Sequence, residues 1–179
     1  MSSDLKEIYS KKVIPAMRAE FGYKNVMAVP KIEKATVNIG VGRIKDEKQM
    51  KEVERVLALV TGQKASPRPA KKAIASFKTR KGQIIGYSVT LRGRRMFDFL
   101  GRLIGVALPR GRDFRGIPEK SFDKAGNLTI GVKEHIVFPE MVNEDVKFIF
   151  GMEVSVTTTA KNKAEGVALL RHMGFPIKS

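Results

Sequence analysis

The sequence predicts an α+β fold, in which a largely antiparallel sheet is packed with helices on one face and leaves its other face open and polar. Two periodicities support this prediction. Four segments alternate apolar and polar residues, as β-strands do, and four others repeat apolar residues at helical spacing. Strict alternation is typical of a sheet with one buried and one wet face. Helices over the buried face then give two packed layers.

The first two predicted helices lie in the N-terminal part of the chain. Residues 4–21 are amphipathic, but Pro15 should kink that helix or restart it. The second helix begins at a capping signature, Asp46 with Gln49, and its apolar stripe stops before Gly62. Both helices present a single apolar face, which is what a covering layer requires.

The other two helices are predicted from the same signals. Residues 94–108 carry an apolar stripe that we expect Pro109 to end. The last helix is capped by Asn162 with Glu165 and closes at Gly174.

Strands are predicted at 34–41, 86–92, 127–132 and 152–159. Their polar positions are mostly Thr, Ser, Asn, Lys and Arg, with few carboxylates. Small hydroxyls beside cations can reach the 2′-hydroxyls and phosphates of an RNA helix. The alternative is an ordinary solvated sheet, because Thr and Ser favour strands in any case.

Composition limits the classes of protein to which the chain can belong. Its 179 residues, 42% of them hydrophobic, fit one globular domain over 1–179. The chain has no Cys, so disulfides, thiolate metal sites and cysteine catalysis are excluded. Without an apolar signal core or a membrane-length apolar run, we expect a soluble, cytoplasmic protein that contacts no membrane. We also expect that it is not a homo-oligomer.

Positive charge is concentrated in one acid-free stretch, residues 55–97. The formal net charge is +16, and the stretch carries eleven cations: Arg55, Lys64, Arg68, Lys71, Lys72, Lys78, Arg80, Lys81, Arg92, Arg94 and Arg95. A block of one sign repels itself unless a polyanion neutralises it. Nucleic acid is the ordinary polyanion of cells, and release of its counterions supplies affinity.

A long loop is predicted at 66–83, in the middle of the acid-free stretch. Pro67 and Pro69 stiffen its entry, and it has no clear period of either kind. Phe77 lies among its cations. The ring could stack on a base, or it could anchor the loop on the core, and the sequence favours neither.

Catalysis and metal binding have little support. The only histidines are His135 and His172, far apart in the sequence, and no nucleophile, paired-carboxylate or phosphate-loop pattern is present. We expect no enzyme activity, no metal and no cofactor. An RNA-modifying enzyme would need such groups on the basic face. A lipid binder would place its cations on an amphipathic helix, whereas here they lie mainly on strands and a loop.

Several short motifs together resemble the bacterial ribosomal protein five family of the large subunit. They occur in order along nearly the whole chain, at 38–42 (NIGVG), 61–63, 75–82 (ASFKTRKG), 89–93 (VTLRG), 112–116, 121–123, 126–132, 136–140 and 157–160. The resemblance implies a protein that binds 5S rRNA and attaches it to the large subunit at the central protuberance. It also implies contact with 23S rRNA, and with a small-subunit protein across an intersubunit bridge that no motif here marks.

The resemblance implies 5S rRNA contacts for Asn38, Gln63 and Thr90, by motif position. Asn38 and Thr90 fall on the wet face that alternation predicts. Neighbouring polar strand positions and cations are expected to join the 5S rRNA contact as well: Lys34, Thr36, Lys64, Ser88 and Arg92. In the family the loop reaches toward the P-site tRNA, which here assigns that contact to Ala75, Ser76, Phe77, Lys78, Thr79, Arg80 and Lys81. Other rRNA phosphates are expected to bind Arg68, Lys71, Lys72, Arg94 and Arg95.

Overall fold

The computed structural model describes residues 5–44, 46–112, 114–142, 144–146 and 148–178. Within these ranges, five strands form one sheet in the order β2–β3–β1–β5–β4, and every pairing is antiparallel. The strands are β1 (Ile32–Gly40), β2 (Ser66–Pro69), β3 (Ile84–Leu91), β4 (Leu128–Val132) and β5 (Met152–Thr158). The predicted α+β fold is confirmed.

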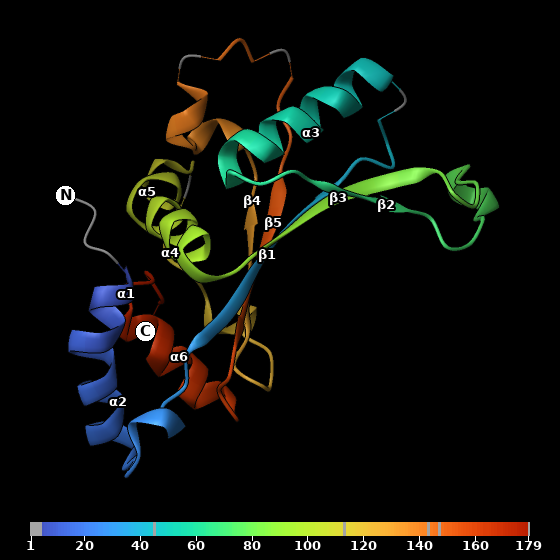
Figure 1. Cartoon of the computed structure of the whole chain (residues 1–179). Coiled ribbons are helices and arrows are strands. Elements are labelled where there is room, and N and C mark those ends of the chain that lie inside the picture. Colours follow the sequence, from blue (N-terminus) through green and yellow to red (C-terminus); the bar gives the residue numbers. More distant parts are fainter. Residues whose placement is uncertain (1–4, 45, 113, 143, 147, 179) are drawn as a thin grey trace.

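The helices lie on one side of this sheet (Figure 1). They are α1 (Leu5–Ile8), α2 (Ile14–Phe21), α3 (Glu47–Thr61), α4 (Gly93–Arg102), α5 (Leu108–Arg110) and α6 (Lys163–His172). Two π-helical segments, η1 (Tyr9–Val13) and η4 (Leu103–Ala107), join α1 to α2 and α4 to α5. Short 3₁₀ turns are η2 (Val26–Ala28), η3 (Ala75–Phe77), η5 (Glu119–Ser121), η6 (His135–Val137) and η7 (Pro139–Met141).

The core lies between the sheet and the helices. Along β1 the side chains of Ala35, Val37 and Ile39 are buried, while Thr36 and Asn38 face the other way. On the helical side, Phe99 stacks against Phe138 with ring centroids 5.8 Å apart, and both rings are fully buried. The alternation in the sequence therefore identified the inner and outer faces of the sheet correctly.

Pro109 does not end its helix, and that prediction is wrong. The helical path continues through η4 into α5, which ends at Arg110. The amide of Leu108 donates to the carbonyl of Leu103, five residues back, and this wider turn makes room for the proline ring. Pro15 has the same arrangement, since it follows η1 at the same spacing. The sequence predicted a kink or a restart at Pro15; the backbone instead stays helical from α1 through η1 into α2, and the π-helical segment η1 is the irregularity that precedes the proline.

Both predicted N-cap residues, Asp46 and Asn162, accept a capping hydrogen bond, although at α3 the donor is the Lys48 amide and not that of Gln49. The Asp46 carboxylate accepts a hydrogen bond from the amide of Lys48 at 2.9 Å and begins α3. At α6, Asn162 accepts from the Glu165 amide at 2.9 Å, and the Glu165 carboxylate accepts from the Lys161 amide. These local interactions fix where both helices begin, so short sequence signals were sufficient.

The first turn of α6 packs unusually close to the turn before β4. A Cβ on Gly166 would overlap the backbone of Gly126, and a Cβ on Gly126 would lie 2.7 Å from the Asn162 carbonyl oxygen. Gly126 also has a positive φ of 81°. This pair of glycines fixes the position of α6 against the β4 end of the sheet.

The segment predicted as a loop, 66–83, begins with the short strand β2, and its remainder forms the connecting end of a β-hairpin with β3. β2 pairs with β3, and the hairpin projects away from the rest of the sheet, at the right of Figure 1. Pro67 and Pro69, which were expected to stiffen the entry of a loop, lie in β2, although proline cannot donate to a sheet ladder. Since β2 is an edge strand with one unpaired side, the missing donors cost nothing there.

Candidate nucleic-acid interface

The open face of the sheet carries a row of hydroxyl groups that crosses four strands. The strand register places Thr90 of β3 beside Thr36 of β1, Thr36 beside Ser155 of β5, and Ser155 beside Thr129 of β4. Neighbouring strands lie about 4.8 Å apart, so the row is about 14 Å long. We call it the hydroxyl row. The oxygens of Thr129 and Ser155 lie 3.3 Å apart and share a hydrogen bond.

Sequence reasoning placed Thr129 and Ser155 on the wet face but did not include them in the site. Only the register shows that they continue a line begun by Thr90 and Thr36, and register cannot be read from alternation alone. A second line of polar residues runs parallel to the hydroxyl row on the same face of the sheet, two positions away on β1, β3 and β5, and extends onto β2. It consists of Ser66, Ser88, Asn38 and Glu153.

Ser88 differs from the sequence prediction. Asn38 is exposed as expected, but Ser88 is only 6% exposed, between Asn38 on one side and Ser66 on the other. Strands pair with β3 on both sides at this position, so Ser88 is enclosed within the sheet. Asn38, Glu153 and Ser66 are exposed and therefore supply the accessible polar groups of this line.

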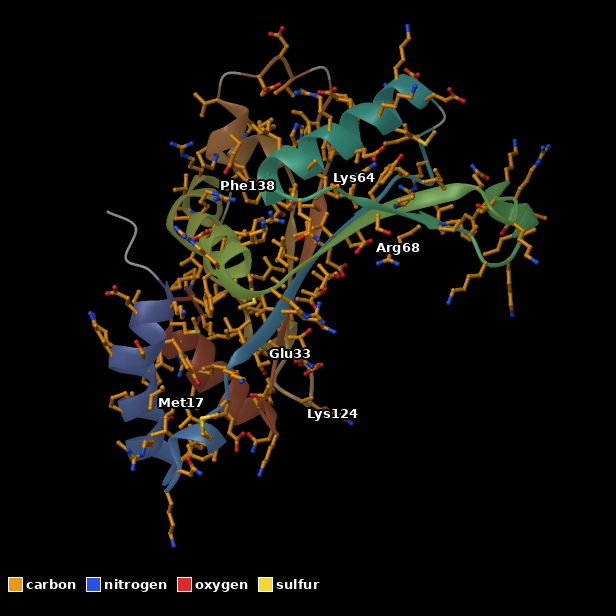
Figure 2. The ribbon with its side chains drawn as sticks, in the orientation of Figure 1. Met17, Glu33, Lys64, Arg68, Lys124 and Phe138 are labelled. Atoms are coloured by element: carbon orange, nitrogen blue, oxygen red, sulfur yellow. The ribbon has the colours of Figure 1, made fainter. Side chains whose placement is uncertain are left out.

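Gln63 and Thr90, separated in sequence, are brought together by the fold. Gln63 follows the left-handed Gly62 at the end of α3, and its side-chain amide donates to the Thr90 carbonyl at 3.2 Å. Gln63 is half-buried, and the contact positions it at one end of the hydroxyl row. Lys64 is exposed immediately after it, just before β2 (Figure 2).

One group of exposed cations lies where β3 leads into α4. Arg92, Arg94 and Arg95 surround the N-terminus of α4. Cations are unfavourable at the positive end of a helix dipole, and no acidic residue offsets them in that first turn. Arg94 has only a loose contact to Asp98, 3.8 Å long and largely exposed. An arrangement unfavourable to the helix itself favours an anionic partner.

Other cations and two carboxylates complete the face. Lys34 is half-exposed on β1, and Arg68 is exposed on β2. Figure 2 shows Arg68, Glu33 and Lys124 on the side of the sheet away from the helices. Glu33 of β1 and Glu153 of β5 are both exposed, so each half of the face also carries a carboxylate among its polar groups.

Arg55, the first cation of the acid-free stretch, does not belong to this surface. Its guanidinium binds the carboxylates of Glu52 at 2.8 Å and Glu144 at 2.7 Å, on the outer side of α3. These two hydrogen-bonded carboxylates raise its pKa. Of the eleven cations counted in the acid-free stretch, Arg55 is therefore neutralised by carboxylates of the same chain.

The end of the hairpin carries the densest group of cations. Lys71, Lys72, Lys78, Arg80 and Lys81 are all exposed, as are Ala75 and Ser76, while Thr79 is half-buried. No acidic partner lies within ion-pairing distance of these cations among the described residues. Phe77 is 75% exposed, so its ring does not anchor the loop on the core.

The described part of the chain offers little support for other functions. It contains no group of three or more His, Asp or Glu residues that could hold a metal ion. None of its helices combines the length and apolar character that a membrane crossing needs. His135 is buried and stacks on Phe150, with ring centroids 4.0 Å apart, and burial lowers its pKa.

Comparisons with family models and with known proteins both identify the same protein family. Residues 25–80 match the family model for ribosomal protein L5, and residues 84–177 match that for the ribosomal L5P family C-terminus. A protein of Solibacter usitatus is 51% identical over 179 residues, which is 99% of each chain. Proteins of Trichlorobacter lovleyi and Cupriavidus metallidurans are each 49% identical, over 98% and 100% of both chains. All three relatives are called large ribosomal subunit protein uL5.

Proposed function

Because this chain belongs to the ribosomal protein L5 family, a non-enzymatic family of the large ribosomal subunit, we propose that it attaches 5S rRNA to that subunit at the central protuberance. The open face of the sheet is the contact surface. On this proposal the protein acts in the cytoplasm as part of the ribosome, and it requires no cofactor.

The hydroxyl row is the observation that carries this proposal. Four hydroxyls in line on a rigid sheet can exchange hydrogen bonds with 2′-hydroxyls and phosphates along a shallow RNA groove. Neutral hydroxyls read the shape and the sugar of the RNA, whereas cations supply attraction to any phosphate. Asn38 and Gln63 stand beside the row with amide groups that can reach base edges.

Phosphates are bound by the cations around the row. Arg92, Arg94 and Arg95 at the start of α4 meet the backbone on one side, and Lys34, Lys64 and Arg68 extend the contact over the β1–β3 part of the face. Lys71 and Lys72 lie further out on the hairpin and bind phosphates of the neighbouring 23S rRNA. These contacts position the RNA, and the amides and hydroxyls recognise it.

The hairpin end has a separate role, contact with the P-site tRNA. It projects away from the hydroxyl row, and its cations have no acidic partner in the described part of the chain. Contact with a small-subunit protein across an intersubunit bridge completes the proposal, without assigned residues.

Two substitutions on the face test the 5S rRNA contact. Thr36→Val keeps the β-branched shape, and Asn38→Ala shortens an exposed side chain, so neither should disturb folding. Each is expected to weaken 5S rRNA binding by about 5-fold to 150-fold, since an RNA polar group left unpaired costs roughly 1–3 kcal/mol. Binding is measured by filter retention with purified 5S rRNA.

Ser10→Ala is the matched control, because it removes an exposed hydroxyl from η1 on the far side of the helical layer. It should bind 5S rRNA like the wild type. If Thr36→Val and Asn38→Ala fold normally and also retain full affinity, the open face is not the contact surface.

A further inference from the structure

A hollow of about 830 Å³ lies between the hairpin and the turn that follows β1. Its apolar wall is formed by Ile74, Phe77 and Ile85, whose exposed fractions are 47%, 75% and 37%. Large apolar residues gathered around one hollow on a charged surface usually mark a binding site. The volume falls within the range of pockets that hold small organic groups.

The rim of this hollow is cationic. Arg43, Lys71 and Lys72 line it, all three are exposed, and none has an acidic partner within ion-pairing distance in the part of the chain that the structure describes. The lining includes no carboxylate. The hollow therefore suits a ligand that joins a flat apolar group to a negative charge.

The backbone around the hollow is fixed by hydrogen bonds. Ile74 and Thr79 exchange amide–carbonyl bonds of 3.0 and 3.1 Å, and Ala70 pairs with Gln83 at 2.8 Å. Between them, Lys78 takes a left-handed conformation, with φ at 52°, at the end of the short turn that carries Phe77. Because the site is built in advance, a ligand does not have to order it.

We propose that this hollow receives one unstacked base of an RNA strand, with the adjoining phosphates on Arg43, Lys71 and Lys72. The base lies against Phe77 and the two isoleucines, and a nucleotide is the ligand that presents a flat ring beside an anion. This inference rests on the proposed function, in that the hairpin binds RNA. It adds a base-binding site on the side of the hairpin, next to the turn after β1.

Gly42 allows the hollow to be closed without any change of charge. A Cβ on Gly42 would lie 3.8 Å from the Ile85 Cβ, an ordinary contact, and Gly42 does not have a positive φ. Gly42→Leu should therefore fold and place a bulky side chain against Ile85, in the part of the hollow where the base would lie. Gly105→Leu is the matched control, because Gly105 is exposed in η4 on the helical side and a Cβ there meets nothing within 4 Å.

The test compares two labelled probes of equal length and charge, a short oligoadenylate and its abasic counterpart, by fluorescence anisotropy with the full chain. The wild type and Gly105→Leu should bind the oligoadenylate at least about 5-fold more tightly, since stacking one base contributes that much. Gly42→Leu should lose this difference and still bind the abasic probe equally well. Ile85→Ser, which thins the apolar wall, should reduce the difference too.

Three results would overturn the inference. The first is equal binding of both probes by the wild type, and the second is a base preference that survives in Gly42→Leu. The third is a Gly42→Leu variant that loses binding to phosphatidylglycerol vesicles and not to oligoadenylate, which would assign the hollow to a lipid chain. If these failures occur while 5S rRNA still binds, the proposed function stands. If 5S rRNA does not bind the wild type, the proposed function has failed.

Discussion

The salt dependence of 5S rRNA binding should report how many cations of the face meet phosphates. Six cations flank the hydroxyl row without a strong internal partner: Lys34, Lys64, Arg68, Arg92, Arg94 and Arg95. If each neutralises one phosphate, log affinity should fall with log salt at a slope of about −4 to −5. A roughly fourfold rise in salt would then weaken binding about 500-fold.

Neutralising two of these six cations tests the count. The double variant Lys64→Gln with Arg92→Gln should make the slope shallower by about 1.5, since each phosphate contact contributes about 0.7 to 0.9. Both side chains are exposed, so the variant should keep its fold. The measurement is a filter-binding titration with 5S rRNA over a series of monovalent salt concentrations.

The hairpin supplies the control for this experiment. Lys78, Arg80 and Lys81 are equally exposed but lie beyond the face, so their joint replacement by Gln should leave the 5S slope unchanged. A flat salt response in the wild type would refute the electrostatic reasoning. An equal loss of slope in both variants would refute the division between face and hairpin.

Three further outcomes follow from the structure. The same hairpin triple variant should release P-site tRNA from ribosomes faster while 5S rRNA stays bound, and equal loss of both would mean that the hairpin is not a separate site. Gly166→Ala should lower the free energy of unfolding by at least about 2 kcal/mol, because its Cβ overlaps backbone, whereas Gly105→Ala should be neutral or stabilising in urea denaturation. Burial lowers the pKa of His135 from 6.5, so the unfolded chain binds the extra proton and the free energy of unfolding should fall from pH 7 to pH 5. His135→Phe should weaken this pH dependence, and an unchanged profile would contradict the assignment.

Much of the fold could be predicted because its signals are local. Alternation identified β1, β3, β4 and β5, and the caps at Asp46 and Asn162 each depend on neighbours within a few residues. β2 was missed because Pro67 and Pro69 are tolerated only at an edge, and the position of a strand in a sheet is not a local property. The helix end predicted at Pro109 was wrong because the π-helical segment before it accommodates the proline ring, and the sequence pattern does not reveal that segment.

The candidate site was predictable in composition and less so in arrangement. Asn38, Thr36 and Thr90 were expected on the wet face, and they lie there. The burial of Ser88 and the loss of Arg55 to internal carboxylates depend on residues distant in sequence. The contribution of Ser155 and Thr129 depends on strand register, which joins segments more than a hundred residues apart.

The central pairing of the sheet has a consequence for the folding of the chain. Thr36 of β1 pairs with Ser155 of β5, more than a hundred residues further along the chain, so this pairing forms only when the long segment between the two strands is in place. Contacts that distant close slowly, because a long loop must be ordered first. Until then the acid-free stretch lies next to an incomplete sheet whose apolar side is unprotected. The hydroxyl row is therefore complete only after β1 and β5 have paired, so this long-range step must precede any contact that uses all four hydroxyls.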